Sequence, residues 1–128
     1  MLKATKRREV YLCSVCGNIV EVLHPGRGQL ECCNKPMFLL EEKTSGTGSE
    51  KHIPIIKTSE EEVIIEVGSI PHPMEDGHYI EWIEISVDDF THRKFLKPRD
   101  EPKAVFRIKA KRITARAYCN LHGLWRTP

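Results

Sequence analysis

The positions of the cysteines constrain this chain more than any other feature. Four of its five cysteines lie near the start, as Cys13 and Cys16 followed by the adjacent pair Cys32 and Cys33. A unit of about 40 residues rarely buries enough apolar surface to fold alone, and normally needs a metal, disulfides or a partner subunit. Because five cysteines cannot all pair within one chain, the pattern favours metal ligands over a disulfide framework.

The composition indicates a globular protein of a reducing compartment. Hydrophobic residues make up 40% of the chain and charged residues 30%, and no apolar run approaches the roughly 20 residues that span a bilayer. The basic segment Lys6-Arg7-Arg8 leads into an alternating stretch, whereas a secretion signal would continue with an apolar core. We therefore expect a cytoplasmic protein with no membrane segment, in which free thiols persist.

The charge balance argues against a dedicated nucleic-acid binder. The chain has 20 Lys and Arg against 18 Asp and Glu, a net charge of +2, whereas binders of DNA or RNA rely on dense clusters of positive charge. We expect the basic groups of this chain to be solvated surface. They are Lys6-Arg7-Arg8 and the set Lys109, Lys111, Arg112 and Arg116.

The second part of the chain has the pattern of a β-sheet protein with little helix. Short segments rich in Val, Ile and aromatic residues are separated by Gly, Pro and Asp turn signals. Besides one long segment, the predicted strands are Val63–Val67, Ala104–Ile108 and Ile113–Tyr118. Several short strands at this spacing favour an antiparallel β-sandwich or barrel.

The long segment, Tyr79–Val87, is predicted to be a central strand. Its apolar residues fall on both faces: Ile83 lies on one face, which Glu81 interrupts, and Ile80 and Trp82 lie on the other. A strand that is apolar on both faces is buried on both sides of its sheet.

A polar segment separates two parts of different character. Residues 41–50 are rich in Glu, Gly, Ser and Thr, which is typical of a boundary or a mobile loop. We therefore divide the chain into residues 1–38, a small metal-binding domain, and residues 39–128, a larger β-domain.

The four early cysteines can supply one tetrahedral metal site. A C-x-x-C turn directs Cys13 and Cys16 to one side, and Cys32 and Cys33 can complete the set. The spacing permits zinc or iron, although adjacent cysteines are unusual for a zinc ribbon because neighbouring side chains must bend to reach one ion. A metal that only stabilises the fold is the simpler alternative, and a thioredoxin-like redox motif lacks its βαβ context.

A second set of potential ligands lies in the β-domain. His72 is flanked by two prolines, His78 follows an Asp-Gly turn, and Cys119 precedes His122 by three residues. Together with His52, these residues occupy loops that one end of a β-sandwich can hold rigidly. His24 and His92 have no such setting, and we expect them to be surface residues.

This donor set suits a divalent iron. Four neutral imidazoles can lie in a plane with the Cys119 thiolate below it, which leaves a sixth position open. The Fe²⁺ ion and one thiolate give a net charge of +1, which attracts a small anion, and the thiolate donates electron density toward the ligand opposite it.

At this point the sequence resembles the desulfoferrodoxins, the two-iron superoxide reductases. The resemblance covers nearly the whole chain. Its motifs are Val10–Val22 with Cys32-Cys33, Glu50-Lys51-His52-Ile53-Pro54, Gly68–Met74, His78–Ile83, Phe95–Pro98 and Tyr118–Gly123.

The resemblance implies an all-β fold, with a small desulforedoxin-like domain joined to an immunoglobulin-like β-sandwich in a homodimer. It implies reduction of superoxide to hydrogen peroxide, without release of dioxygen, by electrons from a rubredoxin-like donor. It also implies two mononuclear irons, Fe(Cys)₄ and Fe(His)₄(Cys). The ligands of the first would be Cys13, Cys16, Cys32 and Cys33, and those of the second His52, His72, His78 and His122 with Cys119 axial.

Two further residues receive roles from the same resemblance. We expect Lys51 to attract superoxide and help deliver protons, and Glu50 to occupy the open position when the iron is oxidised. The alternatives are a zinc-ribbon binding module, which would leave the second donor set unexplained, and a simple electron carrier, for which an open site would be superfluous. The residues leave open whether the first iron relays electrons or only stabilises its domain.

Overall fold

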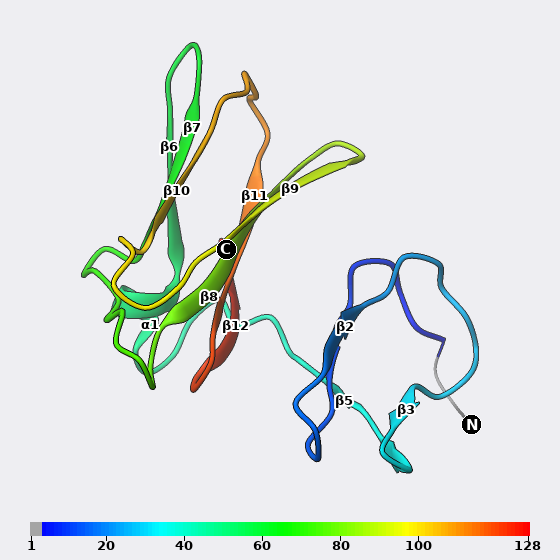
Figure 1. Cartoon of the computed structure of the whole chain (residues 1–128). Coiled ribbons are helices and arrows are strands. Elements are labelled where there is room, and N and C mark those ends of the chain that lie inside the picture. Colours follow the sequence, from blue (N-terminus) through cyan, green and yellow to red (C-terminus); the bar gives the residue numbers. More distant parts are fainter. Residues whose placement is uncertain (1–3) are drawn as a thin grey trace. The chain divides into compact units, whose positions relative to one another are not determined.

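The chain folds as two compact units (Figure 1). The computed structural model describes residues 4–128. The first unit ends at Glu41 and the second begins at Glu42. This division falls at the start of the polar segment, three residues after the boundary drawn from the sequence.

The first unit is a small antiparallel β-structure. One sheet has the strand order β2-β1-β5, and a separate hairpin pairs β3 with β4. The strands are β1 (Val10–Leu12), β2 (Ile19–Glu21), β3 (Glu31–Cys32), β4 (Lys35–Pro36) and β5 (Phe38–Leu39). Among the described residues of this unit, the buried apolar side chains are Val10, Cys13 and Val22. So small a core supports the expectation that the unit needs a metal to stay folded.

The second unit is an antiparallel sandwich of two sheets, with strand orders β10-β7-β6 and β12-β11-β8-β9. The all-β prediction is therefore confirmed. The strands are β6 (Pro54–Thr58), β7 (Val63–Val67), β8 (Ile80–Val87), β9 (Phe90–Phe95), β10 (Lys103–Phe106), β11 (Thr114–Cys119) and β12 (Gly123–Arg126). A four-residue helix, α1 (Ser49–His52), precedes β6. No helix among residues 4–128 is long and apolar enough to cross a membrane.

The core lies between the two sheets and follows the alternation of the strands. Strand β7 contributes every second residue, and β8 contributes Ile83 and Ile85, which are fully buried. On β11 the inward row is Ala115, Ala117 and Cys119. Because alternate residues of a strand share one face, the Cys119 thiol ends a row of core side chains.

A register shift explains the irregular pattern of Tyr79–Val87. Trp82 pairs with Tyr118, but the next pair is Ile80 with Cys119, so Glu81 is an extra residue in β8. A bulge of this kind changes which residues face inward beyond it. Ile80 therefore joins the core with Ile83, and the prediction that it shares a face with Trp82 is wrong. The prediction of a central strand buried on both faces is confirmed.

The outer face of the four-stranded sheet holds a buried ion pair. Glu84 accepts hydrogen bonds from Arg116 at 2.9 Å, Arg93 at 3.2 Å and the indole of Trp82 at 3.0 Å. The side chains of Glu84 and Arg116 are only 1% and 4% exposed. The prediction that Arg116 is solvated is therefore wrong, because Glu84 compensates its charge inside the protein.

The electrostatics of Glu84 follow from these contacts. Burial raises its pKa, but the positive charges and hydrogen bonds of Arg116 and Arg93 outweigh burial and leave the pKa below its ordinary value of 4.5. The contribution of the ion pair to stability is therefore complete above about pH 4.5 and is lost as the pH falls through the lower value of the folded state.

Glu84→Gln is expected to lower the free energy of unfolding of the sandwich by about 3 kcal/mol at pH 7, because the buried guanidinium of Arg116 loses this carboxylate. Urea unfolding followed by tryptophan fluorescence measures the loss, since both tryptophans, Trp82 and Trp125, lie in the sandwich. The difference from the parent should narrow on acidification. In the control, Glu66→Gln breaks an exposed 2.7 Å pair with Lys57 and should change stability by less than about 1 kcal/mol; equal losses would contradict the prediction.

Candidate metal centres

The four cysteines of the first unit converge on one point. Cys13 follows β1, Cys16 lies in the next turn, Cys32 ends β3 and Cys33 lies in the β3–β4 turn. One sulfur atom from each lies within 4.8 Å of all the others. The Sγ atoms of Cys16 and Cys32 are 3.5 Å apart, and those of Cys32 and Cys33 are 4.0 Å apart. The predicted four-cysteine set is therefore brought together.

The adjacent cysteines reach the same point because of the turn that holds them. Cys33 and Asn34 form the two-residue loop between β3 and β4, with φ values of 54° and 59°. Two positive φ values are typical of the tight hairpin turn whose twist matches its strands. Cys32 thus projects from a strand and Cys33 from a left-handed turn residue, so the two side chains leave the backbone in different directions.

The ionisation of these thiols indicates a place for a cation. A hydrogen bond from the Cys16 amide is the main reason that the pKa of Cys13 falls to about 6. The nearby sulfurs of Cys16 and Cys32 raise the pKa of Cys33 to about 12. Ionisation of Cys13 therefore disfavours ionisation of Cys33. Four thiolates this close together need a positive ion among them. The donor set fits a tetrahedral metal bound by sulfur.

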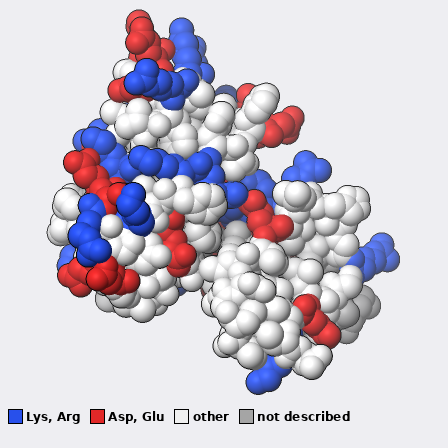
Figure 2. Space-filling view, viewed as in Figure 1, with Lys and Arg blue, Asp and Glu red and all other residues white. Residues whose placement is uncertain are grey.

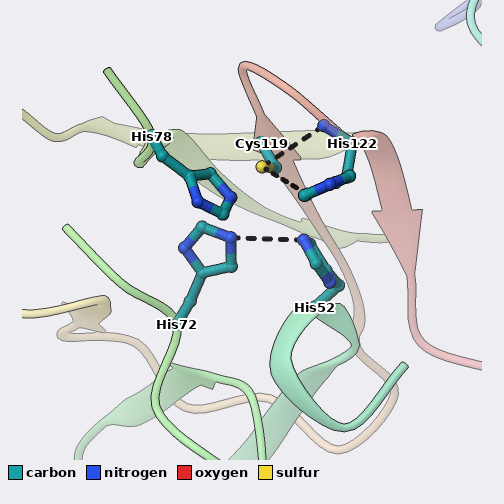
Figure 3. A group of neighbouring side chains, drawn as sticks. All are labelled: His52, His72, His78, Cys119 and His122. Atoms are coloured by element: carbon teal, nitrogen blue, oxygen red, sulfur yellow. Dashed lines mark hydrogen bonds between the residues drawn. The ribbon is translucent and has the colours of Figure 1, made fainter. Parts of the chain in front are cut away.

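The second donor set lies at one end of the sandwich (Figure 3). His52 ends α1, His72 lies between β7 and β8, His78 precedes β8, Cys119 ends β11, and His122 lies in the β11–β12 turn. One ligand atom of each lies within 4.8 Å of all the others. All five predicted residues are brought together, whereas His24 and His92 lie outside both sets.

The four imidazoles form a closed ring. Neighbouring ring centres are separated by 4.7 Å for His52 and His72, and by the same distance for His72 and His78. The remaining two neighbouring pairs, His78 with His122 and His122 with His52, are separated by 5.0 Å. Adjacent planes are nearly perpendicular, at 72° to 82°. This cyclic order places all four imidazoles around one common point, where a single ion could contact each of them.

The hydrogen bonds of the histidines direct unprotonated nitrogens inward. Nδ1 of His52 lies 2.7 Å from the Gly48 carbonyl and Nδ1 of His72 lies 2.6 Å from the Pro73 carbonyl. A carbonyl can only accept, so each Nδ1 carries the proton and each Nε2 presents a lone pair. These two Nε2 atoms are 3.2 Å apart, and Nε2 of His78 is buried with no hydrogen-bond partner. Facing lone pairs repel each other unless a cation lies between them, so the donor set fits a metal ion.

Burial favours the neutral form of four of the ligand residues in the absence of metal. It lowers the pKa of His72 to about 4, with further lowering by the neighbouring histidines, and it is also the largest cause of the lowered pKa values of His52 and His78. Burial raises the pKa of Cys119, although the amides of Leu121 and His122 oppose it. Metal binding must therefore displace one proton, from the Cys119 thiol, and none from His52, His72 or His78 near neutral pH.

The predicted catalytic residues lie on the short helix α1 instead of in an irregular loop. Glu50 and Lys51 are exposed and directly precede His52. The backbone of the helix is fixed, because the Glu50 carbonyl accepts hydrogen bonds from the Ile70 amide at 2.9 Å and from the Ser69 hydroxyl at 3.1 Å. Their side chains can thus move over an anchored backbone.

Sequence reasoning missed the groups that support the ligands. Trp125 is 3% exposed and stacks on His52, with ring centres 4.7 Å apart and planes 20° apart. Its indole N–H donates to the His122 carbonyl at 3.1 Å, and Lys43 donates to the same carbonyl. The position of Trp125 three residues after His122 was the available signal. The backbone carbonyls of Gly48 and Pro73 left none.

The fold and the two donor sets define a non-haem metalloprotein with two mononuclear metal sites. Family models agree with this division: "Desulfoferrodoxin, N-terminal domain" matches residues 5–40 and "Desulfoferrodoxin" matches residues 44–128. The chain belongs to the desulfoferrodoxin family, and its two donor sets match the two iron sites of that family.

Individual relatives resemble the chain over nearly its full length. A desulfoferrodoxin homolog of Archaeoglobus fulgidus is 58% identical over 123 residues, which cover 96% of this chain and 98% of that protein. The desulfoferrodoxin of Nitratidesulfovibrio vulgaris is 53% identical over 118 residues, covering 92% and 94%. The crystal structure of the superoxide reductase from Treponema pallidum matches with a TM-score of 0.76 and 26% identity, covering 94% and 96%.

The segment Gly68–Ile70 anchors α1 through its hydrogen bonds to the Glu50 carbonyl. A Cβ atom on Gly68 would lie 2.7 Å from the Glu50 carbonyl oxygen and 3.0 Å from the Lys51 carbonyl carbon, both of them backbone atoms. Gly68→Ala must therefore displace α1 and His52, and we expect iron affinity at the histidine site to fall about tenfold. Iron retained after dialysis against a chelator measures the effect. Gly77→Ala is the matched control, because its Cβ would meet nothing within 4 Å; equal retention in both variants would contradict the prediction.

Proposed function

We propose that this chain is a superoxide reductase that acts at the histidine–cysteine centre. The observation that carries the proposal is the closed ring of four imidazoles joined by one buried thiol. His122 is exposed and His78 is half-buried, so a small anion from solvent can reach this side of the site. The structural neighbour from Treponema pallidum is a superoxide reductase, which supports the same activity.

Residues of the chain divide between two irons in this proposal. Cys13, Cys16, Cys32 and Cys33 hold the first. His52, His72, His78, His122 and Cys119 hold the second. Iron held by these residues would supply one electron for each superoxide, which would take up two protons to give hydrogen peroxide. The amides that hydrogen-bond Cys119 Sγ, including that of His122 at 3.4 Å, limit how strongly the sulfur donates electron density.

Lys51 attracts the substrate and assists proton delivery. Figure 2 shows acidic and basic side chains interspersed over the face of the sandwich in view, and the net charge is only +2, so attraction for an anion must be local. Lys51 is exposed beside His52, and its charge contributes to the lowered pKa of His78, after the larger effects of burial and His122. Because Lys51 directly precedes the ligand His52 on α1, its ammonium group can concentrate an anion at the site and orient a proton-donating water.

Glu50 protects the oxidised site. Its carboxylate is exposed on α1, and a permanent negative charge beside the ligands would repel superoxide. With iron bound, the side chain would point away in the ferrous state and would approach in the ferric state, whose added positive charge would attract the carboxylate. The hydrogen bonds of its carbonyl to Ser69 and Ile70 keep its backbone in place during this movement.

The molecular setting is part of the proposal. The chain acts in the cytoplasm as a homodimer and receives electrons from a rubredoxin-like protein, without binding nucleic acid or membranes. In the small unit Phe38 is 60% exposed and Leu39 45% exposed, which suits burial against a second subunit. Light scattering of the purified protein measures the dimer, and a monomer at all concentrations would contradict it.

Metal analysis and visible spectra of anaerobically purified protein test the function. We expect two irons per chain, a thiolate-to-iron band that appears on oxidation, and peroxide without dioxygen from superoxide. Glu50→Ala should alter the oxidised spectrum and leave the reduced one unchanged. Stoichiometric zinc and no colour would instead support the zinc-ribbon alternative.

Lys51→Ala is expected to slow the second-order reaction with superoxide about tenfold at low salt, because a local positive charge is lost. The iron spectrum should not change. The deficit should shrink as salt screens the charge of the parent. Pulse radiolysis measures the rate, and Lys57→Ala, which removes another exposed lysine of the sandwich, is the control. An unchanged rate for Lys51→Ala at low salt would contradict the role of Lys51 in attracting superoxide.

A further inference from the structure

Lys43 lies at the start of the second unit, and its backbone is fixed against the metal-binding end of the sandwich. Its amide donates to the Leu124 carbonyl and its carbonyl accepts from the Arg126 amide, both at 2.9 Å. It forms a parallel bridge with Trp125. The segment that follows the small unit is therefore anchored to β12, the strand that carries Trp125.

The side chain of Lys43 ends on the backbone of a ligand residue. Nζ donates to the His122 carbonyl at 2.9 Å, and Trp125 Nε1 donates to the same oxygen at 3.1 Å. Nζ also lies 5.3 Å from the centre of the Trp125 ring, within the range of a cation–π interaction. Two donors on one carbonyl fix the peptide from which the His122 ring projects.

The same ammonium group reaches a second ligand through Trp125, whose ring stacks on His52. Because Nζ is hydrogen-bonded to the His122 carbonyl and lies over the Trp125 ring, its positive charge is held next to two of the ligand residues. Lys43 thus provides a positive charge fixed beside the ring of imidazoles.

We propose that Lys43 is a positioning residue of the histidine–cysteine centre: its hydrogen bond orients His122, and its fixed charge favours the ferrous over the ferric state. The inference rests on the proposed assignment of iron to these five side chains. Ferric iron carries one more positive charge than ferrous iron, so a neighbouring cation destabilises the ferric state more. Because Lys43 is exposed, water and salt must weaken the effect.

The test is a redox titration of the iron-loaded protein against mediators of known potential, followed by the thiolate-to-iron absorption. In Lys43→Gln at low salt, the equilibrium constant for reduction should fall about three- to tenfold, which corresponds to a potential lower by about 30 to 60 mV. High salt should reduce the difference. Lys43→Arg keeps the charge and a donor, and should keep the parent potential.

Two further variants make the result decisive. Lys57→Gln removes one positive charge from the exposed surface of the same sandwich, and should leave the potential unchanged. Lys43→Met keeps the aliphatic stem beside Trp125. If Lys43→Gln is unstable, Lys43→Met should show the same fall in potential.

Several outcomes would overturn the inference. An unchanged potential in both Lys43→Gln and Lys43→Met would do so, as would an equal shift in Lys43→Arg or in Lys57→Gln. A lower unfolding temperature of metal-free Lys43→Gln with an unshifted potential would indicate a structural role only. These results leave the proposed function intact, whereas absence of the thiolate-to-iron band from the parent would count against that function itself.

Discussion

The main constraint on the histidine site is that unprotonated nitrogens face one another and repel each other. Nε2 of His52 and Nε2 of His72 approach to 3.2 Å, and the proton that could relieve the contact is held on the far side of each ring by a carbonyl. The carbonyls belong to Gly48, the N-cap of α1, and to Pro73 of the Pro-His-Pro segment. The second unit thus holds its donors in place through hydrogen bonds and packing, and a bound cation removes the remaining repulsion.

The two sites differ in what the surrounding protein contributes. The sandwich has an extensive hydrophobic core that includes Cys119, so packing of that core positions its ligands. In the described part of the small unit only a few apolar side chains are buried, and the sulfurs of Cys16 and Cys32 pack against each other near its surface. A metal at the first site therefore contributes to folding itself, whereas at the second it occupies a prepared place.

Much of this arrangement follows from local sequence signals. Val63–Val67 and Ile113–Tyr118 are predicted to be strands because they are rich in β-branched and aromatic residues, whose side chains favour a pleated, half-buried surface. The inward position of Ile80 could not be predicted, because it depends on a register shift opposite Cys119, a property of two strands together. A charged residue such as Arg116 is predicted to lie at the surface. Its burial is possible only because Glu84, 32 residues away in the sequence, pairs with it. The role of Trp125 likewise depends on where His52 lies in space.

The ligands of the histidine site come from distant parts of the second unit. His52 stands before the first strand of the sandwich and His122 stands before the last, so the donor set is complete only when both sheets have assembled. Loop closure over so long a stretch is slow compared with local folding. A partly folded sandwich therefore offers iron an incomplete set of donors, and uptake of iron at this site becomes a checkpoint on the maturation of the whole domain. An ion that can generate radicals when loosely held therefore meets the complete donor set only in chains that have finished folding.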